Sequence, residues 1–340
     1  MKISEIAKKC NVSIGTVDRV LHKRGRVALE TRKKIEKVIE ESGYKPNPIA
    51  QNLKTGKQLK IGVLIPQLGS EYGYWKILYK GMEKAEKEYA FFGVVLIKKE
   101  FNRSVAGDLT LKAQELLSEN IDVLCLAPIV KEESEKVLTL IKKIPYAFFD
   151  SSLPSYSPIS ENLQNAYQAG LTAGRLMSLL APEAHKLACI SVYCHANNLD
   201  QRTNGFTEYY AHHQPAVEII SVKNEFSCTN KDYDTWFTSF LQERGPFDGI
   251  FITNDAVGKF SKTLEHIPLQ KKPKIIGFDS IGENITQLKK STIDALISQQ
   301  PERQGYLTIS EVFRFMVMHQ EKGTEQVHIP IDIILKENLG

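Results

Sequence analysis

The first 60 residues constrain this chain most, because they combine short amphipathic helices with a dense positive charge. Apolar residues recur at helical spacing in residues 3–10, again to about residue 21, and again in about 29–42. Residues 1–60 hold 15 lysines and arginines against 6 aspartates and glutamates, a net charge of +9, whereas the whole chain carries +4. Such a concentration of charge at one end is typical of a nucleic-acid-binding arm on a near-neutral body.

The first two helices are separated by a turn at Asn11 and Val12, and Ser13 is placed to cap the second helix. A helix, a short turn and a second helix that begins after a serine form the helix-turn-helix pattern. The start of the second helix then faces base edges and phosphates, which predicts DNA contacts from Ser13, Ile14, Gly15, Thr16 and Arg19. The alternative interpretation is that these helices only pack against one another, with their charged face in solvent and no role in DNA binding.

A second, shorter helix signal follows the third helix. Asn47 can cap a helix that begins with Pro48 and runs to Lys54. A helix of one to two turns is marginal in water alone, so it would need support from a partner copy and from DNA. Leu53 is its apolar tip, and such a side chain can enter a minor-groove step.

This segment resembles the amino-terminal domain of the lac repressor family of bacterial transcription regulators. The matches extend without gaps over nearly all of residues 3–65, and they are Ile6-Ala7, Val12-Ser13, Thr16-Val17, Arg19-Val20-Leu21, Val27, Thr31-Arg32, Gly43-Tyr44, Pro46-Asn47, Ala50 and Leu53. The resemblance implies major-groove contacts from positions 14, 15, 16 and 19, and hinge-helix contacts from Asn47, Ala50 and Leu53. Asp18 and the Ile14-Gly15 pair depart from the family's pattern, so the operator sequence does not transfer.

From residue 61 onward, apolar strand-like runs alternate with amphipathic helical stretches. This alternation predicts an α/β body of parallel βαβ units. Ten candidate strands are many for one sheet, which favours two sheets with a ligand cleft outside the carboxyl ends of the strands. The predicted domains are a helix-turn-helix domain at 1–46, a hinge helix and linker at 47–60, and a two-lobed ligand-binding and dimerisation domain at 61–340.

Polar and aromatic residues gather at the predicted strand ends and indicate a hydroxyl-binding site. Carboxylates and amides pair with hydroxyl groups, arginine presents a fork of donors, and an aromatic face covers the C–H side of a sugar ring. Each residue taken alone is more often a cap, a turn or a core residue. The candidates are Tyr72, Tyr74, Trp75, Asp150, Asn162, Arg202, Asn254, Asp279 and Gln299.

The body resembles the sugar-binding periplasmic receptor fold as this repressor family carries it, especially its ribose-receptor-like branch. The resemblance rests on Tyr74-Trp75, Asp150-Ser151, Arg202, Asn254, Asp279 and Gln299, and it adds Ser151 to the predicted ligand-binding residues. It also implies three crossings between the lobes, with a first lobe at about 61–158 and 281–320 and a second at about 159–280 and 321–340. Tyr72 and the loop at 193–198 depart from the receptor pattern, so the ligand need not be ribose.

The remaining patterns limit the class of protein. The sequence contains no nucleotide-binding glycine loop, no metal-protease motif, no nucleophile elbow and no histidine spacing that suits a metal. No secretory signal or membrane-length apolar run is present, and five cysteines without Cys-x-x-Cys spacing are expected to be free thiols in the cytosol. No enzyme activity, cofactor, metal or membrane partner is therefore predicted.

Together these features predict a cytoplasmic homodimeric repressor of a carbohydrate-utilisation operon, controlled by a monosaccharide or a derivative in the cleft. The effector could instead be a purine, a phosphorylated sugar or a polyol. Two other functions stay open: a sugar-binding receptor without a DNA role, and an α/β enzyme acting on a sugar or nucleoside. The sequence does not determine whether the effector is an inducer or a corepressor, or whether the protein is a dimer or a tetramer.

Overall fold

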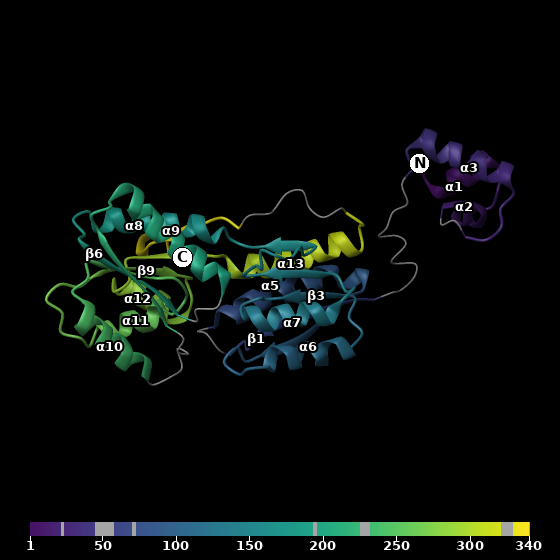
Figure 1. The fold of residues 1–340 in the computed structure, drawn as a ribbon. Coiled ribbons are helices and arrows are strands. Elements are labelled where there is room, and N and C mark those ends of the chain that lie inside the picture. The colour runs from purple at the N-terminus through teal and green to yellow at the C-terminus, as the bar shows by residue number, and fades with distance from the viewer. Residues whose placement is uncertain are drawn as a thin grey trace. The chain divides into compact units, whose positions relative to one another are not determined.

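The computed structural model describes residues 1–21, 24–44, 58–69, 73–192, 196–224, 232–320 and 329–339. Contacts between residues divide the chain into two units, Met1–Gly56 and Lys57–Gly340, and each is described here by itself (Figure 1). Four residues predicted to bind DNA or ligand, Asn47, Ala50, Leu53 and Tyr72, lie outside the described residues, as does most of the predicted hinge segment.

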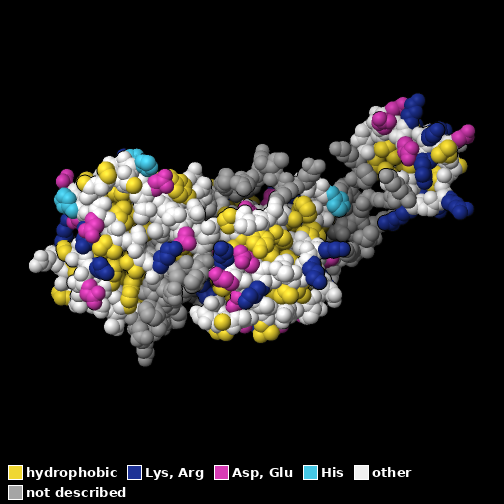
Figure 2. All heavy atoms as spheres, viewed as in Figure 1, with side chains coloured by type: hydrophobic (Ala, Val, Ile, Leu, Met, Phe, Trp, Pro, Cys, Tyr) yellow, Lys and Arg dark blue, Asp and Glu magenta, His cyan; other side chains and the backbone are white. Residues whose placement is uncertain are grey.

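The amino-terminal unit consists of the three helices that the apolar spacing predicts: α1 (Ile3–Cys10), α2 (Ile14–Leu21) and α3 (Leu29–Ser42). Ile6, Val17 and Ile35 are fully buried between them. The predicted cap of α2 is confirmed, because the Ser13 hydroxyl accepts a hydrogen bond from the Thr16 backbone N–H at 3.1 Å. Lysine and arginine side chains project from several sides of this unit (Figure 2).

The second unit contains two sheets, as the number of predicted strands indicated. The first is entirely parallel, in the order β2-β1-β3-β4-β5. Its elements in chain order are β1 (Leu59–Pro66), α5 (Tyr74–Tyr89), η2 (Ala90–Phe92), β2 (Val94–Phe101), α6 (Asp108–Ser118), β3 (Val123–Leu126), α7 (Lys131–Ile141), β4 (Tyr146–Phe149) and β5 (Ser160–Asn162). This sheet and the helices packed on it are called the first lobe.

The second sheet has the order β11-β10-β9-β8-β6-β7 and is parallel except for β11, which runs antiparallel to β10. Its elements are α8 (Ala166–Leu180), β6 (Lys186–Val192), α9 (Asn197–His213), β7 (Glu218–Asn224), α10 (Asp232–Arg244), β8 (Gly249–Ile252), α11 (Val257–Leu264), β9 (Lys274–Phe278), α12 (Gly282–Lys289), β10 (Ala295–Ser298), β11 (Asp332–Ile334) and η3 (Lys336–Asn338). We call this sheet with its helices the second lobe.

Both faces of the second sheet are apolar, as expected for a parallel sheet covered by helices on each side. Along β6, Leu187 and Cys189 pack against α8 and α9. The alternate residues Ala188 and Ile190 face the opposite cluster, which α10, α11 and α12 cover. The sheet therefore forms the middle layer of a three-layer lobe.

The expected boundaries between the lobes need correction. Residues 281–298 were assigned to the first lobe, but β10 pairs in parallel with β9 in the second sheet, and α12 packs there through Leu288. Among the described elements after β10, α13 (Pro301–Met316) returns to the first lobe, where Ile309 and Val312 join its core. The first boundary between the lobes, predicted at residues 158–159, lies further along the chain. The short strand β5, which the sequence did not predict, still pairs with β4 of the first lobe. Backbone pairing sets both boundaries.

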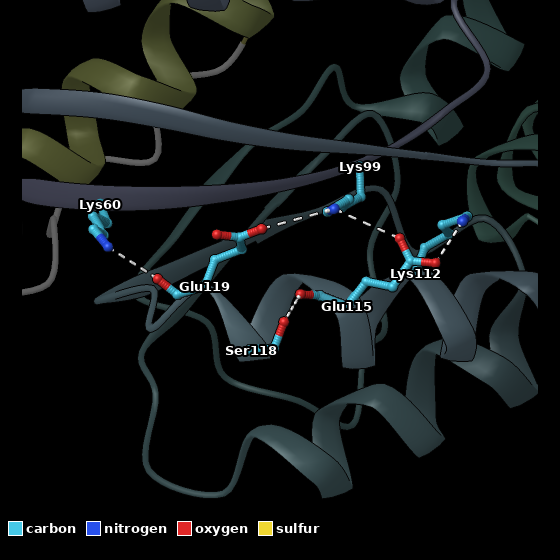
Figure 3. A network of polar contacts seen from close by, with 6 residues as sticks. All are labelled: Lys60, Lys99, Lys112, Glu115, Ser118 and Glu119. Atoms are coloured by element: carbon cyan, nitrogen blue, oxygen red, sulfur yellow. Dashed lines mark hydrogen bonds and ion pairs between the residues drawn. The ribbon is translucent and has the colours of Figure 1, made fainter.

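The start of β1 is held by a polar network where the chain enters the first lobe (Figure 3). The backbone N–H of Lys60 donates to the Asp122 carboxylate at 2.9 Å, and its ammonium donates to the Glu119 backbone oxygen at 3.1 Å. Lys99 lies between Glu115 and Glu119, 3.6 and 3.9 Å from their carboxylate oxygens. The contacts of Lys60 attach the first residues of β1 to the carboxyl-terminal end of α6 and the loop after it, and those of Lys99 attach β2 to the same helix end.

Cys10, Cys125 and Cys189 are buried free thiols, while Cys194 and Cys228 lie outside the described residues. None of the described helices combines the length and the apolar character that a membrane span requires.

Candidate functional site

Seven of the predicted ligand-binding residues line one cavity between the two lobes: Tyr74, Trp75, Asp150, Arg202, Asn254, Asp279 and Gln299. They come from segments up to 225 residues apart, and most of them follow the carboxyl end of a strand. Parallel strands bring these ends to one edge of each sheet, and residues distant in sequence meet here because the cavity lies between those edges of the two lobes.

Asp150 follows β4 and Asp279 follows β9, and both adopt a left-handed backbone conformation, with φ of 66° and 65°. Aspartate tolerates this region better than most residues, but it is rarely populated outside glycine. Such backbone strain is common where a side chain must be held in a functional position. The same left-handed backbone conformation at the end of a strand therefore places one carboxylate from each lobe in the cavity.

Arg202, on α9, is fully buried, with 1% of its surface exposed. One of its terminal nitrogens, Nη1, donates to the backbone oxygen of Thr253 at 2.7 Å, and its guanidinium carbon lies 3.7 Å from the centroid of the Phe278 ring. Burial lowers the pKa of Arg202, while the neighbouring carboxylates, Asp279 first and Asp150 next, act in the opposite direction. Its Nε–H has no partner among the described residues, so it remains available as a donor.

The carboxylate of Asp279 is held by Gln299. The backbone N–H of Gln299 donates to Oδ1 at 3.1 Å and its side-chain amide donates to Oδ2 at 2.8 Å. Burial raises the pKa of Asp279 to about 6, although Arg202 and the two bonds from Gln299 favour the charged form. This carboxyl is poised to change its charge within one or two units of neutral pH.

The first lobe contributes an aromatic pair and a carboxylate. The Tyr74 hydroxyl donates to Oδ1 of Asp150 at 2.8 Å, and the Tyr74 and Trp75 rings meet edge to face with centroids 5.0 Å apart. Burial, together with the charge of Asp150, raises the pKa of Tyr74 well above its ordinary value. Tyr74 therefore stays protonated and orients the carboxylate towards the second lobe.

A second candidate site lies on the amino-terminal unit. Ser13, Ile14, Gly15 and Arg19 are exposed and Thr16 is half-buried, so the five predicted contact residues are at the surface of the cap and the first two turns of α2. Ile14 is 51% exposed, which is unusual for an isoleucine on a helix whose opposite face carries the buried Val17 and Val20. An exposed apolar side chain beside hydroxyl groups and an arginine suits a surface that reads DNA bases.

Comparison with protein families identifies both parts of the chain. Residues 61–316 match the family described as periplasmic binding protein domain, and residues 2–47 match the family described as bacterial regulatory proteins, lacI family. The chain belongs to the periplasmic-binding-protein-like regulators of the lacI family. The resemblance that the sequence suggested is thereby confirmed for both domains.

Individual relatives cover most of the chain. It is 24% identical over 320 residues to a sucrose operon repressor of Lactococcus lactis subsp. lactis, covering 86% of this chain and 89% of that protein. It is 25% identical over 302 residues to a ribose operon repressor of Halalkalibacterium halodurans, covering 82% and 80% of the two chains. A crystal structure of a putative LacI transcriptional regulator from Bacteroides fragilis superposes with a TM-score of 0.76 at 25% identity, covering 83% of this chain and 98% of that one.

Two predicted ligand residues lie apart from the cavity around Arg202 in this lacI-family chain. Asn162 is the last residue of β5, which pairs with β4. Its side-chain amide donates to the Ser160 hydroxyl at 2.8 Å, so it makes a contact within its own strand. Ser151 lines a neighbouring cavity with Asp150. Asn254 lines the expected cavity but also donates to the Val192 backbone oxygen at 3.2 Å, which fixes the ends of β6 and β8 together.

The cavity also contains residues that the prediction of site residues omitted, chiefly Arg103, Asn198 and Asp255. Asp255 adjoins the predicted Asn254, and Arg103 follows a strand as the other candidates do, so a strand-end rule could have found both. Asn198 lies four residues before Arg202 on one face of α9. Helical spacing from Arg202 is the only sequence signal that would have found it.

Close packing of α8 and α9 positions Arg202. A Cβ atom on Gly170 would lie 2.2 Å from the backbone oxygen of Arg202, and one on Gly205 would lie 2.1 Å from the backbone oxygen of Tyr167. The two helices therefore cross where each presents a glycine to the other's backbone. This contact fixes how far the Arg202 side chain reaches into the cavity.

Proposed function

We propose that this chain is a transcription regulator that binds a DNA operator through α2 and responds to a small sugar in the cavity around Arg202. The observation that carries the proposal is the joining, in one chain, of a lacI-family DNA-binding domain to a receptor-like domain whose cavity presents Arg202, Asp279 and Asp150. Repressors of sucrose and ribose operons among its relatives support a carbohydrate-utilisation operon as the target.

On this proposal, Ser13, Thr16 and Arg19 contact phosphates and base edges, while Ile14 and Gly15 allow thymine-methyl contact or a close backbone approach. Asn47, Ala50 and Leu53 would act in the hinge. The protein would work as a homodimer on a pseudo-palindromic operator in the cytoplasm. A change in lobe closure on effector binding would alter the spacing of the two amino-terminal domains.

In the cavity, the Nε–H of Arg202 is a donor for a ligand oxygen, and the side-chain oxygen of Asn198, which has no partner among the described residues, is an acceptor. One donor and one acceptor four residues apart on α9 suit neighbouring hydroxyl groups. Asp150 and Asp279 add charged acceptors, and Trp75 adds an aromatic surface. We propose that these residues, with Gln299 and Asn254, bind the sugar.

The test combines two measurements on the full chain. Binding to a selected operator, followed by fluorescence anisotropy, should weaken steeply with salt and disappear when residues 1–56 are deleted. A thermal-shift screen against ribose, fructose, glucose and galactose should identify a stabilising ligand, since a ligand that binds only the folded state raises its stability by mass action.

The variant Arg202→Lys should abolish that thermal shift, because lysine lacks the planar fork of donors. Operator binding without ligand should persist in this variant. Sequence-indifferent or salt-insensitive DNA binding would contradict the regulatory function. Retention of the full thermal shift in Arg202→Lys would instead contradict the assignment of the cavity.

A further inference from the structure

A second cavity adjoins the one around Arg202 and is the roomier of the two. It measures about 190 Å³, against about 40 Å³ for the cavity around Arg202. Asp150 and Asn198 line both cavities. The Asn198 amide donates to the backbone oxygen of Asp150 at 3.2 Å, so this hydrogen-bonded pair borders both cavities.

Two residues that line the second cavity carry a buried side-chain oxygen that has no hydrogen-bond partner within the described residues, the hydroxyl of Ser151 and the amide oxygen of Gln164. Their residues are 1% and 7% exposed. The Gln164 amide nitrogen donates to the backbone oxygens of Ser298 and Pro330, at 2.8 and 3.0 Å. These two bonds identify the nitrogen end of the amide, so the unpaired acceptor is the amide oxygen. Buried polar groups are usually paired, so two such oxygens on residues that line one cavity are candidate partners for a ligand.

The charges of the lining identify the class of that ligand. Asp150 and Glu161 are the acidic residues of the lining, and it contains no lysine, arginine or histidine. A phosphate or carboxylate group would therefore meet only like charge and lose its hydration. The lining suits a neutral polyhydroxylated ring instead. Gln164 offers an acceptor oxygen, Ser151 a hydroxyl group and Tyr167 an aromatic ring.

We infer that the effector site extends past Asp150 and Asn198 into this second cavity, which binds a second neutral sugar ring. The effector is then a disaccharide or a glycoside, with one ring beside Arg202 and the other beside Ser151 and Gln164. This inference rests on the proposed sugar-responsive function and specifies its ligand. It also accounts for Ser151, a predicted ligand-binding residue that lines the second cavity and not the cavity around Arg202.

The test is isothermal titration calorimetry on the full chain with sucrose, maltose and lactose, with their constituent monosaccharides, and with glucose 6-phosphate. At least one disaccharide should bind about tenfold or more tightly than either of its constituents. A tenfold difference corresponds to about 1.4 kcal/mol, the size of one or two added hydrogen bonds.

Two variants locate the second ring. Ala166→Leu adds bulk to a residue that lines the second cavity, and it should reduce the disaccharide preference to about one while leaving monosaccharide affinity within about twofold. Ser151→Ala removes an oxygen without breaking a hydrogen bond of the protein, and should reduce the preference about threefold to tenfold. Gln168→Leu, exposed on the same helix and outside the lining, is the matched control and should change nothing.

The outcomes separate this inference from the proposed function. Monosaccharide binding without any disaccharide preference overturns the extension and leaves the regulator intact. A preference that Ala166→Leu does not alter, or tighter binding of glucose 6-phosphate, also overturns the extension. Failure of every sugar to bind, with operator binding retained, overturns both the extension and the sugar effector of the proposed function.

Discussion

Asn198 and Asp150 lie on opposite lobes and are joined by one side-chain amide. The Asn198 nitrogen lies 3.2 Å from the backbone oxygen of Asp150 and 3.4 Å from its carboxylate Oδ2. Beside this pair, the Asn197 amide donates to the Ser152 hydroxyl at 3.2 Å, and Leu199 packs into the core of the first lobe. The amino-terminal turn of α9 therefore makes both polar and apolar contacts that join the two lobes.

The variant Asn198→Ala should favour a more open arrangement, because it removes a buried bond between the lobes. A lost hydrogen bond of this kind is worth about 1 kcal/mol, which corresponds to a change of about fivefold in the closed population. Small-angle X-ray scattering should show a larger radius of gyration for the variant. Asn204→Ala, exposed on the same helix, is the control, and equal radii for the two variants would contradict this role of Asn198.

Stability should depend on pH through Asp279. Burial raises the pKa of this carboxyl from its ordinary 3.8 to about 6, so between these values the folded chain holds a proton that the unfolded chain has released. The free energy of unfolding should therefore fall as the pH rises from about 4 to about 6, by at most about 3 kcal/mol, and level off above. Asp279→Asn should flatten this part of the profile, measured by urea unfolding at several pH values.

The same titration should affect the effector in the opposite direction. A ligand hydroxyl that donates to the ionised Asp279 meets a neutral and weaker acceptor once the carboxyl is protonated. Effector affinity should therefore be highest above pH 6 and fall as the pH drops below it, as measured by calorimetry. A flat affinity profile between pH 5 and 8 would exclude direct contact between Asp279 and the ligand.

Gly170→Ala should displace α9, because the added Cβ would lie 2.2 Å from the backbone oxygen of Arg202. Forcing extra volume into a close contact costs about 1–3 kcal/mol, more than alanine gains in a helix. We expect a lower melting temperature and weaker effector binding together, since Arg202 moves with α9. Gln168→Ala, exposed on the same helix, is expected to leave both properties unchanged.

Arg19→Ala should weaken operator binding and relax sequence preference, because Arg19 is exposed on the face of α2 that carries the other predicted contacts. The loss for a base contact is about 1–3 kcal/mol for the preferred sequence and less for non-specific DNA. Lys37→Ala on α3 removes the same charge from an exposed residue paired with Glu41 at 3.9 Å. If both variants lose the same affinity on every DNA sequence, Arg19 acts only through its charge.

Several parts of this chain were predictable because their causes are local. The helices of the amino-terminal unit follow from apolar spacing, and Ser13 acts as a cap through a bond to a residue three positions away. The two-sheet body follows from the alternation of strands and helices. The strand-end position of Asp150, Asn254 and Asp279 brought them to one cavity, because parallel strands of each sheet end at the same edge and the cavity lies between the two lobes at those edges.

Other features depend on pairing between distant segments. The sequence does not reveal that residues 281–298 stay in the second lobe, since this depends on β10 finding β9 as its neighbour. It does not separate Ser151 from Arg202, because adjacent residues at a strand end can face different cavities. Asn198 was not predicted, because its role depends on its hydrogen bond to Asp150 of the other lobe and not on its neighbours in the sequence.

The sequence by itself determined which domains this chain contains and which chemical groups serve them, because helix periodicity, charge and strand-end chemistry are encoded within short windows. Only the tertiary structure decided where one lobe ends and the next begins, and which polar atoms remain free to meet a ligand. Whether a buried oxygen such as that of Gln164 has a partner depends on every segment that packs around it, and those segments come from three distant parts of the chain.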